Sequence, residues 1–320
     1  MIMFYKYNRV SVRAFARCLF VYGAFIISYA APGQLVSRKL SAADTGETIV
    51  IHEGKKNVLH FQYKPKSYNG QYERAGYVHP LYGLNGEILT EDMPEDHPYH
   101  RGIFWAWHQV LRDEKKVADG WISENILWKP GKMDIEKGPG FIRLCADIYW
   151  RLITNKDTIS LLKERTVITV FVQKRNTRVI DFDITLLPVV TNVSIGGAEN
   201  EKGYGGFCLR LRLPSDIRFN SEDIDIIPQE NAVKAGEWMD FTGSFAGSNM
   251  QKAGIVVMTQ HDPQSDRRLW ILRNQKSMQN IVDPGNSPVR IPDAGWHRKY
   301  RLVIHDGTLN TERINGLMKA

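Results

Sequence analysis

Apolar and polar residues alternate along most of the chain, in short runs separated by glycine, proline and small polar residues. From residue 180 to 186, isoleucine, phenylalanine and leucine hold the even positions, and aspartate or threonine holds the odd ones. A period of two residues buries one face of a strand and wets the other, which is typical of antiparallel sheets. The runs predicted as strands are Thr48–His52, Asn57–Tyr63, Phe141–Trp150, Thr158–Gln173, Arg178–Leu187, Phe207–Leu213, Gly254–His261, Arg268–Leu272 and Arg298–His305.

Helical periodicity is scarce by comparison. Only the tail from Leu309 to Ala320 has a pattern compatible with a turn or two of helix. Regular strands without alternating helices predict an all-β fold. We expect a large antiparallel β-sandwich, built as a jelly roll or as a mutarotase-like twisted double sheet. No linker interrupts the pattern, so residues 31–320 are predicted to form a single domain.

The first thirty residues have a different pattern. Four basic residues precede an apolar run from Cys18 to Ala30, which ends in Ser28-Tyr29-Ala30. A basic region, a short apolar run and a small-x-small end are typical of a secretory signal peptide. We therefore predict a signal peptide at residues 1–30 and a periplasmic or extracellular protein, with an uncleaved N-terminal anchor as the alternative.

The net charge of the chain bears on which partners it could bind. Export would remove four of the 42 basic residues, and the formal net charge of +7 would fall to about +3. The rest of the chain has no basic run with interleaved aromatics, which argues against a nucleic-acid partner. No apolar stretch after residue 30 approaches the roughly 20 residues of a membrane span. The mature cysteines, Cys145 and Cys208, could form a disulfide or remain two separate thiols.

Candidate chemistry concentrates between Tyr77 and Trp107. Four of the nine histidines fall between residues 79 and 108, where an even spread would place about one. Pro98 favours the second position of a type I turn, so His97 and His100 would begin and end that turn. The ends of such a turn lie within about 7 Å at Cα. We therefore predict that the two imidazoles converge on one ligand, with Asp96 and Arg101 beside them.

These residue types suit a small sugar or an oligosaccharide as the substrate. Imidazole titrates near neutral pH, so His97 or His100 could act as acid or base. Tryptophan faces could stack on a sugar ring, although the same tryptophans could belong to the core; the candidates are Trp105, Trp107 and Trp121. Asp119 could contact the site or start a turn. The predicted catalytic residues are Asp96, His97 and His100, and the predicted substrate-binding residues are His79, Arg101, Trp105, Trp107, Tyr204, Arg210 and His261.

Two other functions fit the same residues. His97 and His100, joined by Asp96 and one further histidine, could bind zinc, iron or copper and form an oxygenase-like metal site. The metal candidates are His97, His100 and His108, but a His-x-x-His pair in a loop lacks the fixed geometry of a helical pair, so the sequence requires no cofactor. A non-catalytic carbohydrate-binding module would use the same aromatic residues.

Several motifs together resemble the family named methane oxygenase PmoA, whose members are mostly secreted bacterial proteins without a settled function. The resemblance rests on His79-Pro80-Leu81, Asp96-His97-Pro98-Tyr99-His100-Arg101-Gly102, Asp119-Gly120-Trp121, Gly203-Tyr204-Gly205-Gly206-Phe207, Trp238–Gly243, Gln260-His261-Asp262-Pro263 and Tyr300–Gly307. Tyr99 stands where that family often has another histidine. Because the chain lacks the apolar spans of a membrane oxygenase, the resemblance implies a secreted β-sandwich that acts on carbohydrate as a lyase, an epimerase or a hydrolase, and methane chemistry is not expected.

Overall fold

The alternating runs form strands in the computed structural model, which describes residues 39–245, 251–259 and 269–319. Strands make up 56% of the described residues and helix 3%, and the large sheets are antiparallel, so the predicted all-β sandwich is confirmed. Residues 38–320 form one compact unit. The predicted signal peptide at residues 1–30 and the candidate His261 lie outside the described residues.

The first sheet has nine strands and carries the candidate site. Its middle strands are short, and β7 lies between β6 and β15. In spatial order the strands are β1 (Leu40–Asp44), β2 (Thr48–Glu53), β3 (Lys56–Gln62), β6 (Tyr77–Leu81), β7 (Ile103–Ala106), β15 (Gly206–Leu209), β22 (Gln279–Ile281), β21 (Leu269–Ile271) and β18 (Val233–Lys234).

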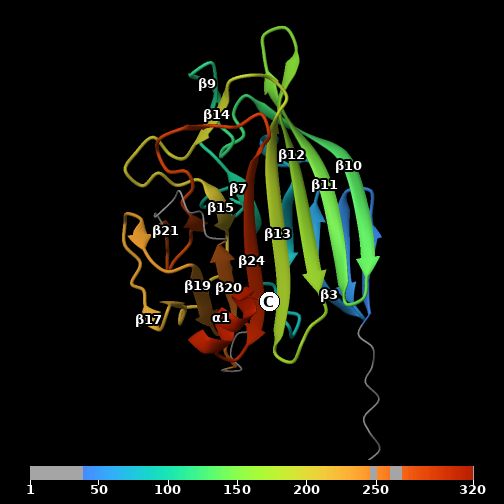
Figure 1. Ribbon diagram of the computed structural model, residues 1–320, viewed down its shortest axis with the longest axis vertical. Helices are drawn as coiled ribbons and strands as arrows, with labels where there is room; N and C mark the ends of the chain where they lie inside the picture. Colours follow the sequence, from blue (N-terminus) through green and yellow to red (C-terminus); the bar gives the residue numbers. More distant parts are fainter. Residues whose placement is uncertain (1–38, 246–250, 260–268, 320) are drawn as a thin grey trace, which may run out of the picture. The chain divides into compact units, whose positions relative to one another are not determined.

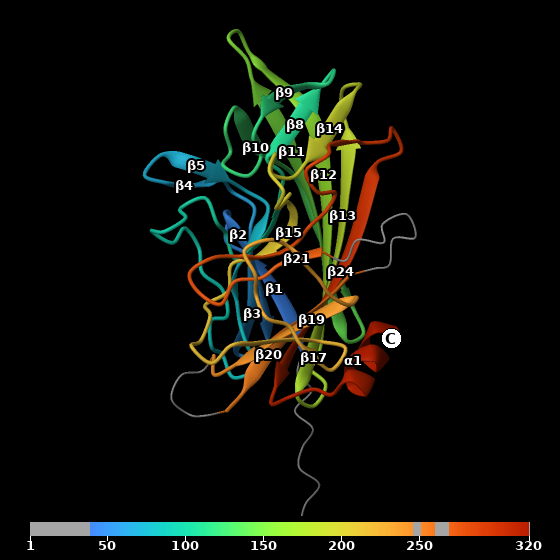
Figure 2. The same cartoon turned by 90° about the vertical axis from the view of Figure 1, so that its left-hand side faces the viewer.

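The second sheet also has nine strands, several of them long. In spatial order they are β10 (Ile126–Gly138), β11 (Phe141–Ile153), β12 (Thr158–Phe171), β13 (Thr177–Pro188), β24 (Trp296–Asp306), β20 (Ala253–Thr259), β19 (Trp238–Gly243), β16 (Arg218–Ser221) and β17 (Ile224–Asp225). Figure 1 shows the long strands β10 to β13 and β24 side by side, with the blue strands of the first sheet behind them. Figure 2 shows these layers from the side.

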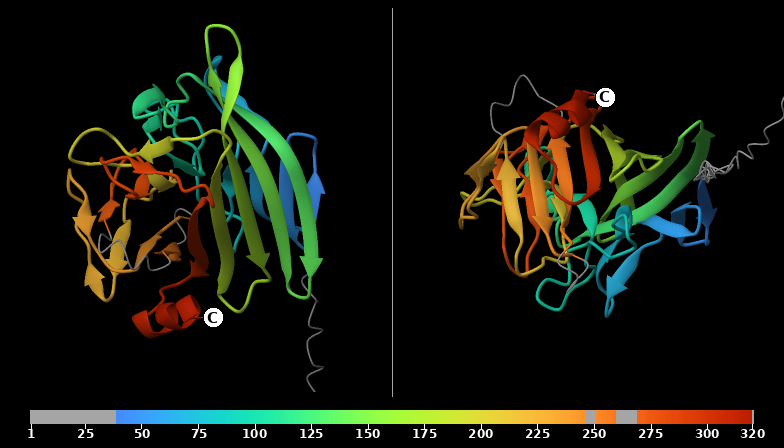
Figure 3. Two further views of the ribbon diagram at one scale, coloured as in Figure 1. Left: turned by 45° about the horizontal axis from the view of Figure 1, so that its top comes forward. Right: turned by 90° about the horizontal axis from the view of Figure 1, so that it is seen from below.

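Two small sheets and one helix complete the described part of the chain. A four-stranded sheet consists of β23 (Val289–Arg290), β14 (Val193–Gly196), β8 (Gln109–Arg112) and β9 (Lys115–Ala118), and a two-stranded sheet of β4 (Lys66–Tyr68) and β5 (Gln71–Arg74). Helix α1 (Thr311–Lys319) lies within the tail predicted as helical. Its Ile314 packs with Trp238 and Val303, so α1 covers part of the second sheet (Figure 3).

The main core lies between the inner faces of the two large sheets. The Trp105 ring of β7 stacks on Phe207 at 6.3 Å, and Phe207 stacks on Tyr300 of β24 at 4.3 Å. Ile103, Trp105 and Trp107 belong to this core, as their alternation predicts, and Phe104 and Ala106 point to the opposite face. That opposite face of β7 is the floor of the candidate site.

The two cysteines among the described residues do not pair. Cys145 lies on β11 and Cys208 on β15, in different sheets, and both thiols are free. Burial raises the pKa of the Cys208 thiol, which makes it an unreactive packing residue. The disulfide alternative is therefore wrong for the described structure. Within the described residues, no helix is long and apolar enough to cross a membrane.

Candidate functional site

A small second hydrophobic cluster covers the outer face of β7 and β15. Phe104, Ala106 and Cys208 form its floor, and Trp121 packs on them. Tyr99 and Tyr204 are only partly buried and pack at its margin. Unlike the main core, this cluster brings polar rings and apolar rings together at the surface.

The predicted turn at Pro98 is present and brings the two histidines together. The backbone N–H of His100 donates to the carbonyl of His97 at 2.9 Å. Their imidazole rings stack in parallel, with centroids 4.6 Å apart and planes 3° apart. The predicted turn is confirmed and brings His97 and His100 together, while their convergence on one ligand stays a prediction.

Asp96 orients His97. Its Oδ2 lies 2.8 Å from Nδ1 of His97, and Arg210 donates to both carboxylate oxygens at 2.9 and 3.0 Å. Burial alone would raise the pKa of Asp96, but the hydrogen bond to His97 and the Arg210 guanidinium outweigh it, and the net pKa is lowered. An ionised Asp96 holds a proton on Nδ1, which leaves the lone pair of a neutral His97 on Nε2.

Arg210 and Arg101 anchor the loop through hydrogen bonds and ion pairs with other protein groups. Arg210 also donates from Nε to Glu91 at 2.9 Å. Arg101 is fully buried, donates to the carbonyl of Tyr72 at 2.5 Å and lies 3.6 Å from Asp92. Nη1 of Arg210 and Nε of Arg101 have no partner among the described residues, but both atoms are buried. The structure therefore favours a loop-anchoring role over the predicted binding of hydroxyl or carboxylate groups.

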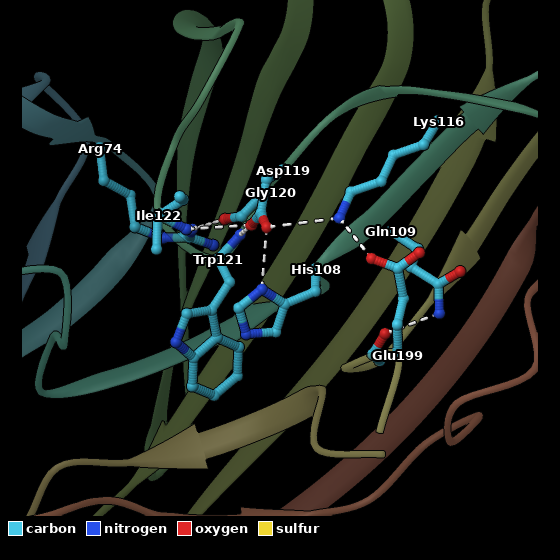
Figure 4. Close-up of polar contacts among 10 residues, drawn as sticks. Arg74, His108, Gln109, Lys116, Asp119, Gly120, Trp121, Ile122 and Glu199 are labelled. Carbon is cyan, nitrogen blue, oxygen red and sulfur yellow. Dashed lines mark hydrogen bonds and ion pairs between the residues drawn. The ribbon is translucent and has the colours of Figure 1, made fainter. Parts of the chain in front are cut away.

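A second imidazole–carboxylate pair lies on the other side of Trp121. Nδ1 of His108 lies 2.8 Å from Oδ2 of Asp119, and the imidazole stacks on the Trp121 indole at 5.2 Å and 17° (Figure 4). Oδ1 of Asp119 accepts the backbone N–H groups of Trp121 and Ile122 at 2.9 and 3.2 Å. Asp119 thus both starts a turn and contacts the site, so both predicted alternatives hold.

Arg74 fixes the segment that carries Asp119. Its Nη1 donates to the carbonyl of Gly120 at 2.8 Å (Figure 4). Its Nη2 donates to the carbonyl of Trp105. The guanidinium is buried and lies over the Trp128 ring at 4.2 Å. A Cβ at Gly120 would come within 3.0 Å of the Trp107 carbonyl, so this position needs the small residue.

Six aromatic side chains form one group, here called the aromatic cluster. His97 and His100 stack, His100 meets Trp121 edge-on at 5.9 Å, and Trp121 stacks on His108. Tyr204 contacts both His108 and Trp121 edge-on at 5.0 Å, and Tyr99 contacts His97 and His100 at 5.8 and 5.0 Å. The members of the cluster are His97, Tyr99, His100, His108, Trp121 and Tyr204.

The two tyrosines bring the two sides of the cluster close together. Burial raises the pKa of Tyr99, and the neighbouring Tyr204 hydroxyl raises it further. Burial also raises the pKa of Tyr204, with a further contribution from Asp119. A continuous chain of ring contacts, from His97 through His100 and Trp121 to His108, places the two imidazole–carboxylate pairs in one cluster.

His100 is more deeply buried than its neighbour His97. It is 3% exposed, and burial, followed by the nearby His97 and Arg210, lowers its pKa to about 2. A group that stays neutral throughout the physiological range is a poor acid or base. The structure therefore favours a stacking role for His100 over the predicted catalytic role.

The other predicted site residues lie elsewhere. Trp105 and Trp107 are 1% and 2% exposed in the main core and offer no face to a sugar, so the core alternative holds for both. His79 bonds Thr90 at 3.0 Å, and burial together with nearby cations lowers its pKa to about 4. Trp121 is also 1% exposed and packs inside the second cluster, so the predicted tryptophan platform is not available there either. Tyr204 instead supplies the aromatic surface, and Tyr99, which the sequence marked only as a missing histidine, joins it.

The metal-site alternative finds no support in the described part of the chain. Among those residues, no three or more histidine, cysteine, aspartate and glutamate side chains gather in a way that could hold a metal ion. His97 and His108 each pair with their own carboxylate on different sides of Trp121.

One comparison with known proteins gives a match. A family model described as "Family of unknown function (DUF6807)" matches residues 48–319. The chain belongs to this family. The match spans the whole aromatic cluster and both of its carboxylates. No curated protein matches the chain.

Proposed function

We propose that this DUF6807 protein is a carbohydrate-active enzyme that uses histidine acid–base chemistry. The observation that carries the proposal is the series Arg210–Asp96–His97 beside the partly buried rings of Tyr99 and Tyr204. An ionised carboxylate that fixes the tautomer of an accessible imidazole is the arrangement that general acid–base catalysis needs. His97 is one-third exposed, so a substrate can reach it.

The sugar substrate follows from the surroundings of His97. Half-buried tyrosine rings offer flat apolar faces with a polar edge, which suits the C–H faces and hydroxyl groups of a pyranose. The resemblance seen in the sequence, to a mostly secreted family without a settled function, also implied a carbohydrate substrate. Export through the predicted signal peptide would give access to external glycans. A non-catalytic binding module would use the same tyrosines, but it has no need for Asp96 and Arg210 behind the imidazole.

A substrate screen with matched variants tests the proposal. Purified protein is incubated with a panel of neutral and uronic-acid oligosaccharides, and the products are followed by proton NMR. We expect turnover that falls by about 10² to 10⁴ in His97→Ala, because that is the usual contribution of a general acid or base. The control is His297→Ala, since His297 also pairs with a carboxylate, Asp183 at 2.5 Å, but lies on β24 of the other sheet.

The outcomes separate the two functions. Loss of turnover in His97→Ala, with normal turnover in His297→Ala, supports the enzyme. Saturable binding of an oligosaccharide without chemical change, weakened by Tyr99→Ala, would replace it with the binding module. Full activity of His97→Ala contradicts the assignment of the site.

A further inference from the structure

The second imidazole–carboxylate pair has features that packing does not explain. Nε2 of His108 is buried and has no hydrogen-bond partner among the described residues. Leaving a buried polar atom unpaired typically costs about 1 to 3 kcal/mol. Among the described residues His60 and His100 also have an unpaired buried ring nitrogen, but of the three only His108 has a carboxylate at its other ring nitrogen, which is the arrangement expected of a proton-transfer group. The carboxylate behind it is held from two directions, by the backbone at Oδ1 and by His108 at Oδ2.

We propose that His108, oriented by Asp119, is a second proton-transfer residue, and that with His97 it forms a two-base site for a carbon-bound proton beside a carbonyl or carboxylate group of a sugar. This inference rests on the proposed function and names its reaction class. The two pairs are chemically alike: each has Nδ1 of an imidazole at 2.8 Å from a carboxylate oxygen. Alike groups can exchange the roles of acid and base, which a reversible proton transfer requires.

The carboxylates themselves argue against glycoside hydrolysis as the reaction. A glycosidase needs two carboxyl groups that face the glycosidic bond, one as acid and the other as nucleophile or base. Here Asp96 is bound by His97 and Arg210, and Asp119 by His108 and two backbone N–H groups. The imidazoles are the groups left to exchange protons with a substrate.

The proposed step balances without a cofactor. Nε2 of a neutral His97 takes the proton from carbon, and the electron pair of the broken C–H bond moves into the adjacent carbonyl group to form an enediolate. Nε2 of a protonated His108 then returns a proton to the other face of that carbon, using the electron pair of the enediolate. The product is the epimer, and the two imidazoles exchange protons with water to restore the starting state.

The test uses epimer pairs in deuterium oxide. The probes are D-mannuronate and L-guluronate oligomers, disaccharides containing D-glucuronate or L-iduronate, and D-glucose with D-mannose, each followed by proton NMR. We expect the wild-type protein to interconvert one pair and to place deuterium at the inverted carbon. His108→Asn should lose interconversion by at least about 100-fold. It should still exchange the proton of one epimer, and His97→Asn should exchange only the proton of the other.

That division between epimers distinguishes catalysis from packing, because a merely structural change would slow both exchanges together. His108→Gln is a second variant in case the first does not fold, and His297→Asn is the control. Interconversion by His108→Asn at the wild-type rate overturns the inference and leaves the proposed function standing. Cleavage of a probe without deuterium at carbon does the same. No chemical change in any sugar, here or in the oligosaccharide panel, contradicts the proposed function itself.

Discussion

Two histidine–aspartate pairs in this protein look alike but differ in whether a ring nitrogen is left without a partner. His305 of β24 directs Nε2 to Asp240 at 3.0 Å and Nδ1 to the carbonyl of Gly307 at 3.0 Å. His108 directs only Nδ1 to Asp119, and its Nε2 has no partner among the described residues. We infer from this difference that a histidine with a carboxylate partner can serve in a functional site only when its second ring nitrogen has no hydrogen-bond partner in the protein.

The surroundings of the two pairs agree with this distinction. His305 is completely buried, and a Cβ at Gly254 would approach its ring to 2.4 Å, so nothing can enter there. The hydroxyl of Thr242 donates to the remaining oxygen of Asp240 at 2.9 Å. His108 is instead flanked by the partly exposed Tyr204. One pair is a closed network, and the other borders the surface.

The largest expected effect is the loss of stability when the closed pair is broken. His305→Ala leaves Asp240 buried without its imidazole partner, and removing one member of a buried pair costs about 3 to 5 kcal/mol. His108→Ala should change the free energy of unfolding by less than about 1 kcal/mol, because it also removes an unsatisfied nitrogen. Urea denaturation of both variants measures this, and equal losses would show that both pairs are structural.

A carboxyl group without an imidazole partner extends the comparison to the inner face of the sandwich. Glu164 of β12 is fully buried and accepts hydrogen bonds from Trp150 at 2.9 Å and Thr166 at 3.1 Å. Burial raises its pKa to about 7, against the opposing effects of these donors and of Arg74. Asp96 shows the opposite shift because His97 and Arg210 complement its charge.

The raised pKa of Glu164 predicts a pH-dependent stability. Between about pH 4.5, where the unfolded chain ionises, and pH 7, the folded state keeps a proton that the unfolded state has lost, so stability falls as pH rises. Glu164→Gln keeps the acceptor for Trp150 without the charge. We expect it to match the wild type near pH 4.5 and to exceed it at pH 8 by about 1 to 3 kcal/mol. Parallel unfolding curves at both pH values would show that Glu164 ionises normally.

Local patterns were enough to predict nine of the strands and the histidine turn, but β10 and several shorter strands were not predicted. Alternation located all nine predicted strands to within a few residues or so, and Pro98 located the turn that stacks His97 on His100. Strand β10 was missed because residues 129–138 are mostly polar and include Pro130. It is an edge strand with a register shift after Pro130, where proline and lysines are tolerated and prevent further pairing.

The assembly of the site could not be predicted in the same way. Trp105 and Trp121 are equally aromatic, and only their positions in the fold put one in the main core and the other beside His108. Asp119 and His108 lie eleven residues apart, at the two ends of the β8–β9 hairpin, and their contact depends on how that hairpin closes. Such pairings come from tertiary packing, which alternation alone does not encode.

The smallest expected effect comes from removing the hydroxyl group of one tyrosine, Tyr204, and is compared with the same change at Tyr300. Tyr204→Phe keeps the edge-on ring contacts with His108 and Trp121 and removes a hydroxyl at the margin of the proposed site. We expect a KM increase of about 10-fold or less, because one neutral hydrogen bond contributes about 0.5 to 1.5 kcal/mol, with an unchanged melting temperature.

The matched control is Tyr300→Phe, whose ring is 6% exposed and stacks on Phe207 in the main core. Its KM should equal that of the wild type, since Tyr300 lies between the sheets and away from the aromatic cluster. A KM increase in Tyr300→Phe as large as that in Tyr204→Phe would mean that the variants act through general packing, and the contrast between the outer cluster and the inner core would lose its functional meaning.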